Sequence, residues 1–116
     1  MDELTQKHPL ALAFIGDAVM NLLVKEQIVT TNNTRVNDLH KQASAILSAK
    51  AQAVLYDKLP LTQAEREVAT RAFNAKHNTV PKNCTLAEYR SATALEAVIG
   101  YNWLLGNRKR VEELIK

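Results

Sequence analysis

The chain has 116 residues, of which 47% are hydrophobic, a length that predicts one domain with a buried core. Its single cysteine, Cys84, excludes an intrachain disulfide and a zinc site built on cysteines, and a lone thiol indicates a reducing, cytoplasmic compartment. The formal net charge of +3 permits nucleic-acid binding without demonstrating it. Acidic residues precede the first apolar run and interrupt the longest apolar stretches, so we expect neither a signal peptide nor a membrane span.

The spacing of apolar residues in the first half of the chain predicts helices. Pro9 suits the first position of a helix, which we expect to run to about Gln27 after a short frayed lead over residues 1–8. Apolar positions at helical spacing then predict two helices, or one helix kinked near Ser48, over residues 35–59.

The second half of the chain contains two sequences typical of helix starts. Capping boxes at Thr62–Glu65 and Thr85–Glu88 each open a helix, the first of which we expect over residues 63–75. Gly106 is a natural helix end, and a short charged helix follows over residues 107–116. The fold class predicted for the whole chain is therefore all-α, with about six helices in one domain.

The stretch over residues 10–24 is apolar on nearly all sides, as in a buried helix. Asp17 and Asn21 interrupt it four residues apart, so they share one face. Gly16 lies beside Asp17, although glycine costs about 1 kcal/mol relative to alanine in a helix interior. An ionised carboxylate in such a segment is costly unless it is paired, hydrogen-bonded or bound to a metal.

A second apolar helix, over residues 91–105, repeats this combination of a carboxylate and an interior glycine. Glu96 is its one carboxylate, and Gly100 follows four residues later on the same side. Glycine permits close approach of two backbones. We therefore expect the two helices to cross near Gly16 and Gly100 and to bring Asp17 and Glu96 together.

Two carboxylates at this point suit metal-dependent hydrolysis of a phosphodiester. Mg2+ activates a water and neutralises phosphate charge, and it prefers one or two carboxylates plus several waters. We assign Asp17 as the principal metal ligand and Glu96 as the second ligand or the residue that positions the attacking water. Thr93 and Asn21 lie one turn from these carboxylates, where each can order a metal-bound water.

Basic and polar side chains gather between the fourth helix and the start of the second apolar helix. Residues 71–90 contain four basic side chains and one acidic side chain, a local excess charge of +3. Such groups can contact phosphates and 2′-hydroxyl groups of RNA, although a solvated surface is the alternative. The candidates are Arg71, Asn74, Lys76, Asn78, Thr79, Lys82 and Arg90. His40 and Lys41 are further candidates, with a hydrogen-bonded or surface histidine as the alternative for His40.

These motifs resemble a known family. LAFIGDAV at 12–19 is similar to the signature helix of ribonuclease III enzymes, LEFLGDAVL, and TALEAVIG at 93–100 to their second catalytic helix, DTVEALIG. Blocks at 39–53, 73–83 and 89–101 resemble Mini-III, the short members that have a catalytic domain and no double-stranded-RNA-binding domain. The resemblance covers almost the whole chain, and several ordered blocks are more specific than one short motif.

The resemblance implies a homodimeric, all-helical endonuclease that cuts double-stranded RNA with Mg2+ as its cofactor. It implies one ribonuclease III-like domain over residues 1–116. The Mini-III branch is implicated in the maturation of large-subunit ribosomal RNA, so the implied substrate is a ribosomal RNA precursor.

The family pattern carries over onto this chain with some departures. Of four acidic positions at the metal site of other ribonuclease III enzymes, two match Asp17 and Glu96, and two fall on Ala13 and Thr93. Mini-III proteins generally show this reduction, and they favour His-Lys at the position of residues 40–41. Their loop RGRNAKS reads RAFNAKH here, with departures at three residues. The departing residues are Ala72, Phe73 and His77.

Three alternatives stay open at this point. The carboxylates can be structural, with Asp17 paired to a neighbour such as Lys50, and Glu96 to Arg90. A non-catalytic RNA-binding protein on the same fold, acting in ribosome assembly, is the second alternative, and the two lost carboxylates favour it. A helical protein-interaction module without an RNA role is the third.

Overall fold

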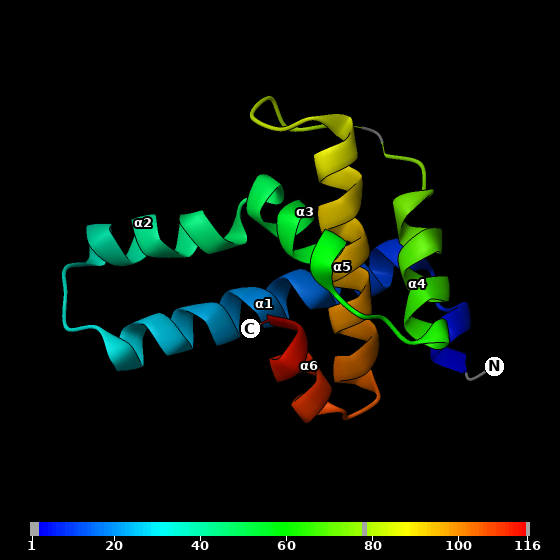
Figure 1. The fold of residues 1–116 in the computed structure, drawn as a ribbon, viewed down its shortest axis with the longest axis horizontal. Coiled ribbons are helices and arrows are strands. Elements are labelled where there is room, and N and C mark those ends of the chain that lie inside the picture. Colours follow the sequence, from blue (N-terminus) through cyan, green and yellow to red (C-terminus); the bar gives the residue numbers. More distant parts are fainter. Residues whose placement is uncertain (1–2, 78, 116) are drawn as a thin grey trace.

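The computed structural model describes residues 3–77 and 79–115, and all regular elements in these ranges are helical (Figure 1). The all-α class with about six helices is thereby confirmed. No helix in these ranges is both long enough and apolar enough to cross a membrane. The elements are the 3-10 helix η1 (Glu3–Gln6) and the α-helices α1 (Pro9–Thr31), α2 (Val36–Leu47), α3 (Ala49–Lys58), α4 (Gln63–Phe73), α5 (Leu86–Leu104) and α6 (Arg108–Ile115).

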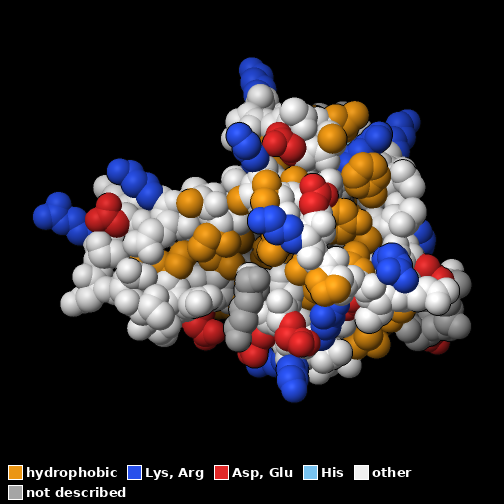
Figure 2. Space-filling view, in the orientation of Figure 1, with side chains coloured by type: hydrophobic (Ala, Val, Ile, Leu, Met, Phe, Trp, Pro, Cys, Tyr) orange, Lys and Arg blue, Asp and Glu red, His pale blue; other side chains and the backbone are white. Residues whose placement is uncertain are grey.

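Helix α5 runs through the middle of the domain and packs against α1, α3, α4 and α6 (Figure 1). Between Ala92 and Asn102, all its residues are buried except Glu96, which is half-buried. This burial explains why the sequence of α5 is apolar on nearly all sides. The second half of α1 and all of α2 form an arm, and hydrophobic side chains gather along the seam between them (Figure 2).

The two interior glycines lie where α1 and α5 cross. A Cβ atom placed on Gly16 would overlap the backbone carbonyl of Glu96, and one placed on Gly100 would overlap that of Leu12. The two backbones are therefore in direct contact, and neither position has room for a methyl group. The crossing predicted from the glycines is confirmed.

Helix α1 ends at Thr31, four residues beyond the predicted end near Gln27. Polar residues at the end of α1 satisfy its last carbonyl groups. The Thr31 hydroxyl donates to the Gln27 carbonyl at 2.8 Å, and the Asn32 side-chain amide donates to the Ile28 carbonyl at 3.0 Å. Side chains of this type can cap a helix as well as interrupt it.

The interruption at Ser48 separates two helices, α2 and α3, and excludes the alternative of one kinked helix. Both capping boxes are present as predicted, at the starts of α4 and α5. Some apolar residues of α2 and α3 do not face the core, because Val36, Ile46 and Val54 are exposed, whereas Gln52 is buried.

The expectation of a frayed lead over residues 1–8 was also wrong for its described part. Residues 3–6 form η1, in which Thr5 is only 2% exposed. The Arg71 guanidinium of α4 donates to the backbone carbonyls of Thr5 and Lys7 and holds this segment against the domain. The sequence of residues 1–8 is mostly polar, and the arginine that holds this segment lies far away in the chain. The local sequence therefore contains no pattern from which the contact could be predicted.

We expect Gly16→Ala to destabilise the domain by about 3 kcal/mol, because overpacking a close backbone contact forces the helices apart. The matched control is Ala87→Val on an exposed part of α5, which should cost less than about 1 kcal/mol through helix propensity alone. Chemical denaturation measures both. Equal free energies of unfolding for Gly16→Ala and the parent protein would contradict the tight crossing.

Candidate active site

A hollow of about 510 Å3 lies at the crossing of α1 and α5, and Asp17 and Glu96 both line it. The juxtaposition of these two carboxylates is as predicted. Their partners in the hollow come from both helices and from the segment between α4 and α5. The remaining lining residues are Leu10, Ala13, Phe14, Lys76, His77, Thr79, Tyr89 and Thr93.

The environment of the two carboxyl groups is strongly asymmetric. Asp17 is exposed, whereas Glu96 is half-buried. Burial, a hydrogen bond with Asp17 and the charge of Asp17 together raise the pKa of the Glu96 carboxyl group to about 8, against a smaller opposing hydrogen bond from Gln52. Two carboxyl groups can hydrogen-bond to each other only when one is protonated, so Glu96 keeps a proton near neutral pH. A cation between the two groups would serve the same purpose as that proton.

The donor set at this point fits a hard, hydrated divalent cation. Asp17 and Glu96 supply two carboxylates, which are ligands that Mg2+ prefers. Across residues 3–77 and 79–115, no cluster of three or more histidine, cysteine, aspartate or glutamate side chains could enclose an ion. Two carboxylates suit an ion that keeps most of its waters, and Mg2+ is such an ion.

Two polar residues predicted to support the site lie beside the carboxylates. The Asn21 side-chain amide donates to the Asp17 carboxylate at 3.1 Å and to the Asp17 backbone carbonyl at 2.9 Å. Thr93 lines the hollow, is 6% exposed, and donates its hydroxyl proton to the Tyr89 carbonyl at 2.8 Å. Its oxygen still has lone pairs that can accept a proton from a water.

The structural alternative for the carboxylates receives no support from the ion pairs in the described part of the chain, where Lys50 does not pair with Asp17 and Arg90 does not pair with Glu96. The Arg90 guanidinium instead lies over the Phe73 ring, 5.9 Å from its centre. The carboxylate that does form a structural ion pair is Glu65, which is bound by Arg110 at 2.7 Å, away from the hollow.

The predicted RNA contacts fall into separate places. Lys76 and Thr79 line the hollow with the carboxylates, as a contact to substrate phosphate would require. Asn74 ends α4 and is exposed, and Lys82 is exposed in the following turn. Asn78 lies outside the described residues. These assignments remain predictions.

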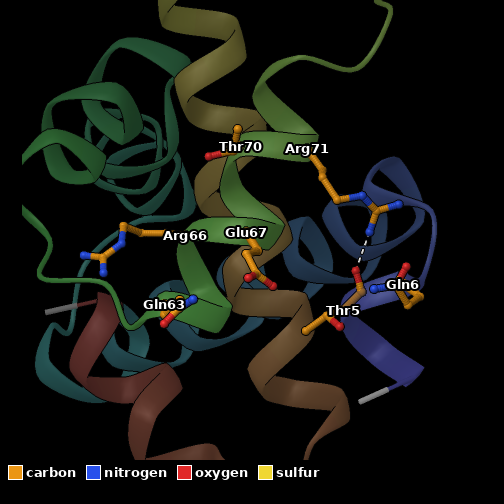
Figure 3. Close-up of a pocket in the computed structure, with 7 residues that line it drawn as sticks. All are labelled: Thr5, Gln6, Gln63, Arg66, Glu67, Thr70 and Arg71. Atoms are coloured by element: carbon orange, nitrogen blue, oxygen red, sulfur yellow. Dashed lines mark hydrogen bonds between the residues drawn. The ribbon is translucent and has the colours of Figure 1, made fainter. Parts of the chain in front are cut away.

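Arg71 lies apart from the carboxylate pair. It lines a different hollow, of about 550 Å3, between η1 and α4, where Figure 3 shows its guanidinium donating to the Thr5 carbonyl. The same hollow contains Arg66 and Glu67, so its charges are mixed. An RNA contact by Arg71 would thus be made at a different hollow from a contact by Lys76.

His40 lines a third hollow, of about 330 Å3, which it shares with Asn21 of α1 and Asn83 from the segment before α5. Asn21 lines this hollow and also donates a hydrogen bond to the Asp17 carboxylate. Lys41 is exposed on the same helix, α2.

The structure adds two residues that the sequence analysis did not assign to the site. Gln52 of α3 is buried, and its side chain lowers the pKa of Glu96. In the sequence it is distinguished only as an amide beside the apolar Ala53. His77 lines the hollow, and its ring packs edge-on against Tyr89 with ring centres 5.1 Å apart. In the sequence, His77 is noted only as one of the residues that differ from the loop pattern of Mini-III proteins.

We expect Glu96→Gln, without metal, to be more stable than the parent protein at pH 9 and to lose this advantage at pH 5. The folded state raises the pKa of Glu96 from its ordinary 4.5 to about 8, so it binds the proton more tightly than the unfolded state. The free energy of unfolding of the parent protein should therefore fall as the pH rises between these values. Urea denaturation in EDTA measures it, and an identical pH dependence for both proteins would contradict the assignment.

Comparison with known proteins bears directly on this arrangement. The Ribonuclease III domain model matches residues 10–107. The Mini-ribonuclease 3 of Symbiobacterium thermophilum is 40% identical over 93% of this chain and 85% of its own length. That of Enterococcus faecalis is 38% identical over 99% of this chain and 90% of its own.

Solved structures agree with the sequence comparison. The crystal structure of a protein from Fusobacterium nucleatum has a TM-score of 0.89 and 32% identity, covering 99% of this chain and 93% of that one. The match of the domain model includes both helices that supply the carboxylates. The chain belongs to the ribonuclease III family, in its Mini-ribonuclease 3 branch.

Proposed function

We propose that Asp17 and Glu96 form the Mg2+-dependent catalytic centre of this endoribonuclease, whose substrate class is double-stranded RNA. The observation that carries the proposal is the meeting of the two carboxylates in one open hollow at the crossing of α1 and α5. A bound Mg2+ would supply an activated water and neutralise charge on the scissile phosphate. The chain's own residues supply the binding, the orientation and the shape of the hollow.

Each residue of the hollow has a separate task in this proposal. Asp17, exposed at the hollow, is the principal ligand, and the Asn21 amide fixes its carboxylate in one orientation. Glu96 is the second ligand or holds the attacking water, because its half-buried position restricts where its carboxylate can point. Lys76, which also lines the hollow, provides a positive charge for the phosphate.

Recognition in this proposal depends on the shape and backbone of the duplex. An A-form RNA duplex hides its major-groove base edges and presents phosphates and 2′-hydroxyl groups. The candidate contacts beside the hollow, Lys76 and Thr79, suit those groups, and exposed Lys82 and Lys41 extend the basic surface. Binding that depends on phosphates weakens steeply as salt rises.

A homodimer is the assembly that we propose. Helix α1 exposes Phe14, Leu22 and Val29, with exposed fractions of 83%, 60% and 58%. Their spacings of eight and seven residues place them on one face of the helix. Large apolar side chains exposed together mark interaction surfaces. Pairing this face would bury it and place two active sites in one particle.

The substrate and location that we propose are a precursor of large-subunit ribosomal RNA and the cytoplasm. The match to Mini-ribonuclease 3 relatives over more than nine-tenths of the chain supports the substrate. The lone cysteine supports a reducing compartment. A non-catalytic RNA-binding role in ribosome assembly is the second candidate, since Ala13 and Thr93 occupy the same hollow without carboxylates.

Cleavage of a long RNA duplex by the purified protein tests the catalytic assignment. We expect cutting to require Mg2+ and to fall by at least about 100-fold in both Asp17→Asn and Glu96→Gln, since each removes a group that holds the metal or water. Glu112→Gln, which removes an exposed carboxylate of α6, is the matched control and should cut normally. Duplex binding without any cutting would favour the non-catalytic role.

Sedimentation velocity tests the proposed dimer. Leu22→Glu should shift the protein from dimer to monomer, because it places a charge in the apolar face of α1. Gln27→Glu adds the same charge on the opposite, exposed side of that helix and should leave the dimer intact. A parent protein that sediments as a monomer at micromolar concentration would disprove this assembly.

A further inference from the structure

The hollow that contains His40 has no acidic side chain among its described lining residues. Its volume is about 330 Å3, and residues of α1, of α2 and of the segment before α5 surround it. The two larger hollows do contain acidic groups, with Asp17 and Glu96 in one and Glu67 in the other. We call this third hollow the polar hollow, and its lining residues are Asn21, Lys25, His40, Ala43, Ser44, Leu47, Ser48 and Asn83.

Two residues that line the polar hollow have polar groups that are already used within the protein. The Ser48 hydroxyl oxygen accepts from the Ala51 N–H at 3.1 Å. The Leu47 carbonyl, which would accept from that N–H in an uninterrupted helix, accepts instead from the Gln52 side-chain Nε2 at 2.9 Å. These two bonds satisfy the backbone at the break between α2 and α3, so neither group needs a ligand.

Four other lining side chains have polar groups that the described part of the protein does not use. Lys25 and His40 form no ion pair with a described residue, and no described residue hydrogen-bonds to the side chains of Ser44 or Asn83. All four are exposed, so a ligand can reach them. They offer an ammonium with three donors, an imidazole N–H, a hydroxyl and an amide. Donors gathered around a cation, without an acid among them, suit an anion.

The polar hollow lies beside the carboxylate pair. Asn21 belongs to its lining and donates to the Asp17 carboxylate at 3.1 Å, and Asp17 lines the hollow at the crossing of α1 and α5. The two hollows are thus adjacent through one hydrogen-bonded pair of residues. A strand of RNA has a phosphate at every nucleotide, so a strand with its scissile phosphate at Asp17 and Glu96 presents another phosphate on either side.

We infer that the polar hollow binds a backbone phosphate that flanks the scissile phosphate of the duplex, with Lys25 as the positive partner and His40 and Asn83 as further donors. The inference rests on the proposed function, because it places the scissile phosphate at the carboxylates. It adds Lys25 and Asn83 to the RNA contacts expected from the sequence, which include His40. A phosphate contact carries no sequence information, so this site fixes the position of the duplex.

Binding of a short RNA duplex, measured by fluorescence anisotropy with Ca2+ in place of Mg2+ over a series of salt concentrations, tests this site. We expect Lys25→Gln to weaken binding about 5-fold and to reduce the slope of log affinity against log salt by about 1, as the loss of one phosphate contact does. The weakening should be the same for duplexes of different sequence. Lys25→Arg, which keeps the charge, should bind as the parent protein does.

A second variant tests the same hollow from another segment of the chain. Asn83→Asp keeps the size of the side chain and adds a negative charge, so it should weaken duplex binding at least as much as Lys25→Gln. The matched controls are Lys109→Gln and Asn107→Asp, which make the same changes of charge at exposed positions in and just before α6. Both controls should bind as the parent protein does.

Parent-like affinity and salt slope in Lys25→Gln or in Asn83→Asp would overturn the polar hollow as a phosphate site, and so would equal losses in the matched controls. Cleavage of the same duplex in Mg2+ separates this failure from that of the proposed function. If the parent protein binds the duplex with the expected losses in the variants but never cuts it, the phosphate contact stands and the catalytic assignment fails. Absence of duplex binding by the parent protein would overturn both.

Discussion

The contact between the backbones of α1 and α5 is the constraint on which the rest of the structure depends. Gly16 and Gly100 let these helices touch, and no side chain larger than hydrogen fits between them. Because Asp17 and Glu96 lie directly beside this contact, the same two glycines determine how close the carboxylates come. This one crossing therefore determines both how the two helices pack and how close the two carboxyl groups lie.

This closeness has an electrostatic cost within the folded protein. Glu96 is half-buried and faces another carboxylate, which raises its pKa to about 8. Side-chain amides partly offset this cost, since Asn21 donates to Asp17 and the Gln52 side chain lowers the pKa of Glu96. A site strained in this way by like charges is suited to bind a cation, and membership of the ribonuclease III family agrees with that reading.

The features that could be predicted from the sequence are those in which a residue is unusual for its place in a helix. A carboxylate and a glycine inside each apolar helix were sufficient to predict the crossing of α1 and α5 and the meeting of Asp17 and Glu96. Capping boxes predicted the starts of α4 and α5 because their hydrogen bonds are local. Fold and carboxylate pair were therefore accessible without coordinates.

Features that depend on distant contacts were not accessible in this way. Arg71 belongs to a basic cluster in sequence, yet its guanidinium is used to hold η1, more than sixty residues earlier in the chain. Gln52 gained its place only because the backbone break at Ser48 exposes the Leu47 carbonyl. Such roles depend on which backbone groups the folded chain brings within reach of a side chain, and hydrophobic periodicity contains no information about that.

The central claim is that Asp17 and Glu96 act as one unit, and the most direct test compares cleavage rates of the two single variants with the double variant Asp17→Asn/Glu96→Gln. Residues that serve one catalytic step show strongly non-additive losses. We expect the double variant to cut duplex RNA no more slowly than the slower single variant. Losses that multiply, or a single variant that cuts at nearly the parent rate, would contradict it.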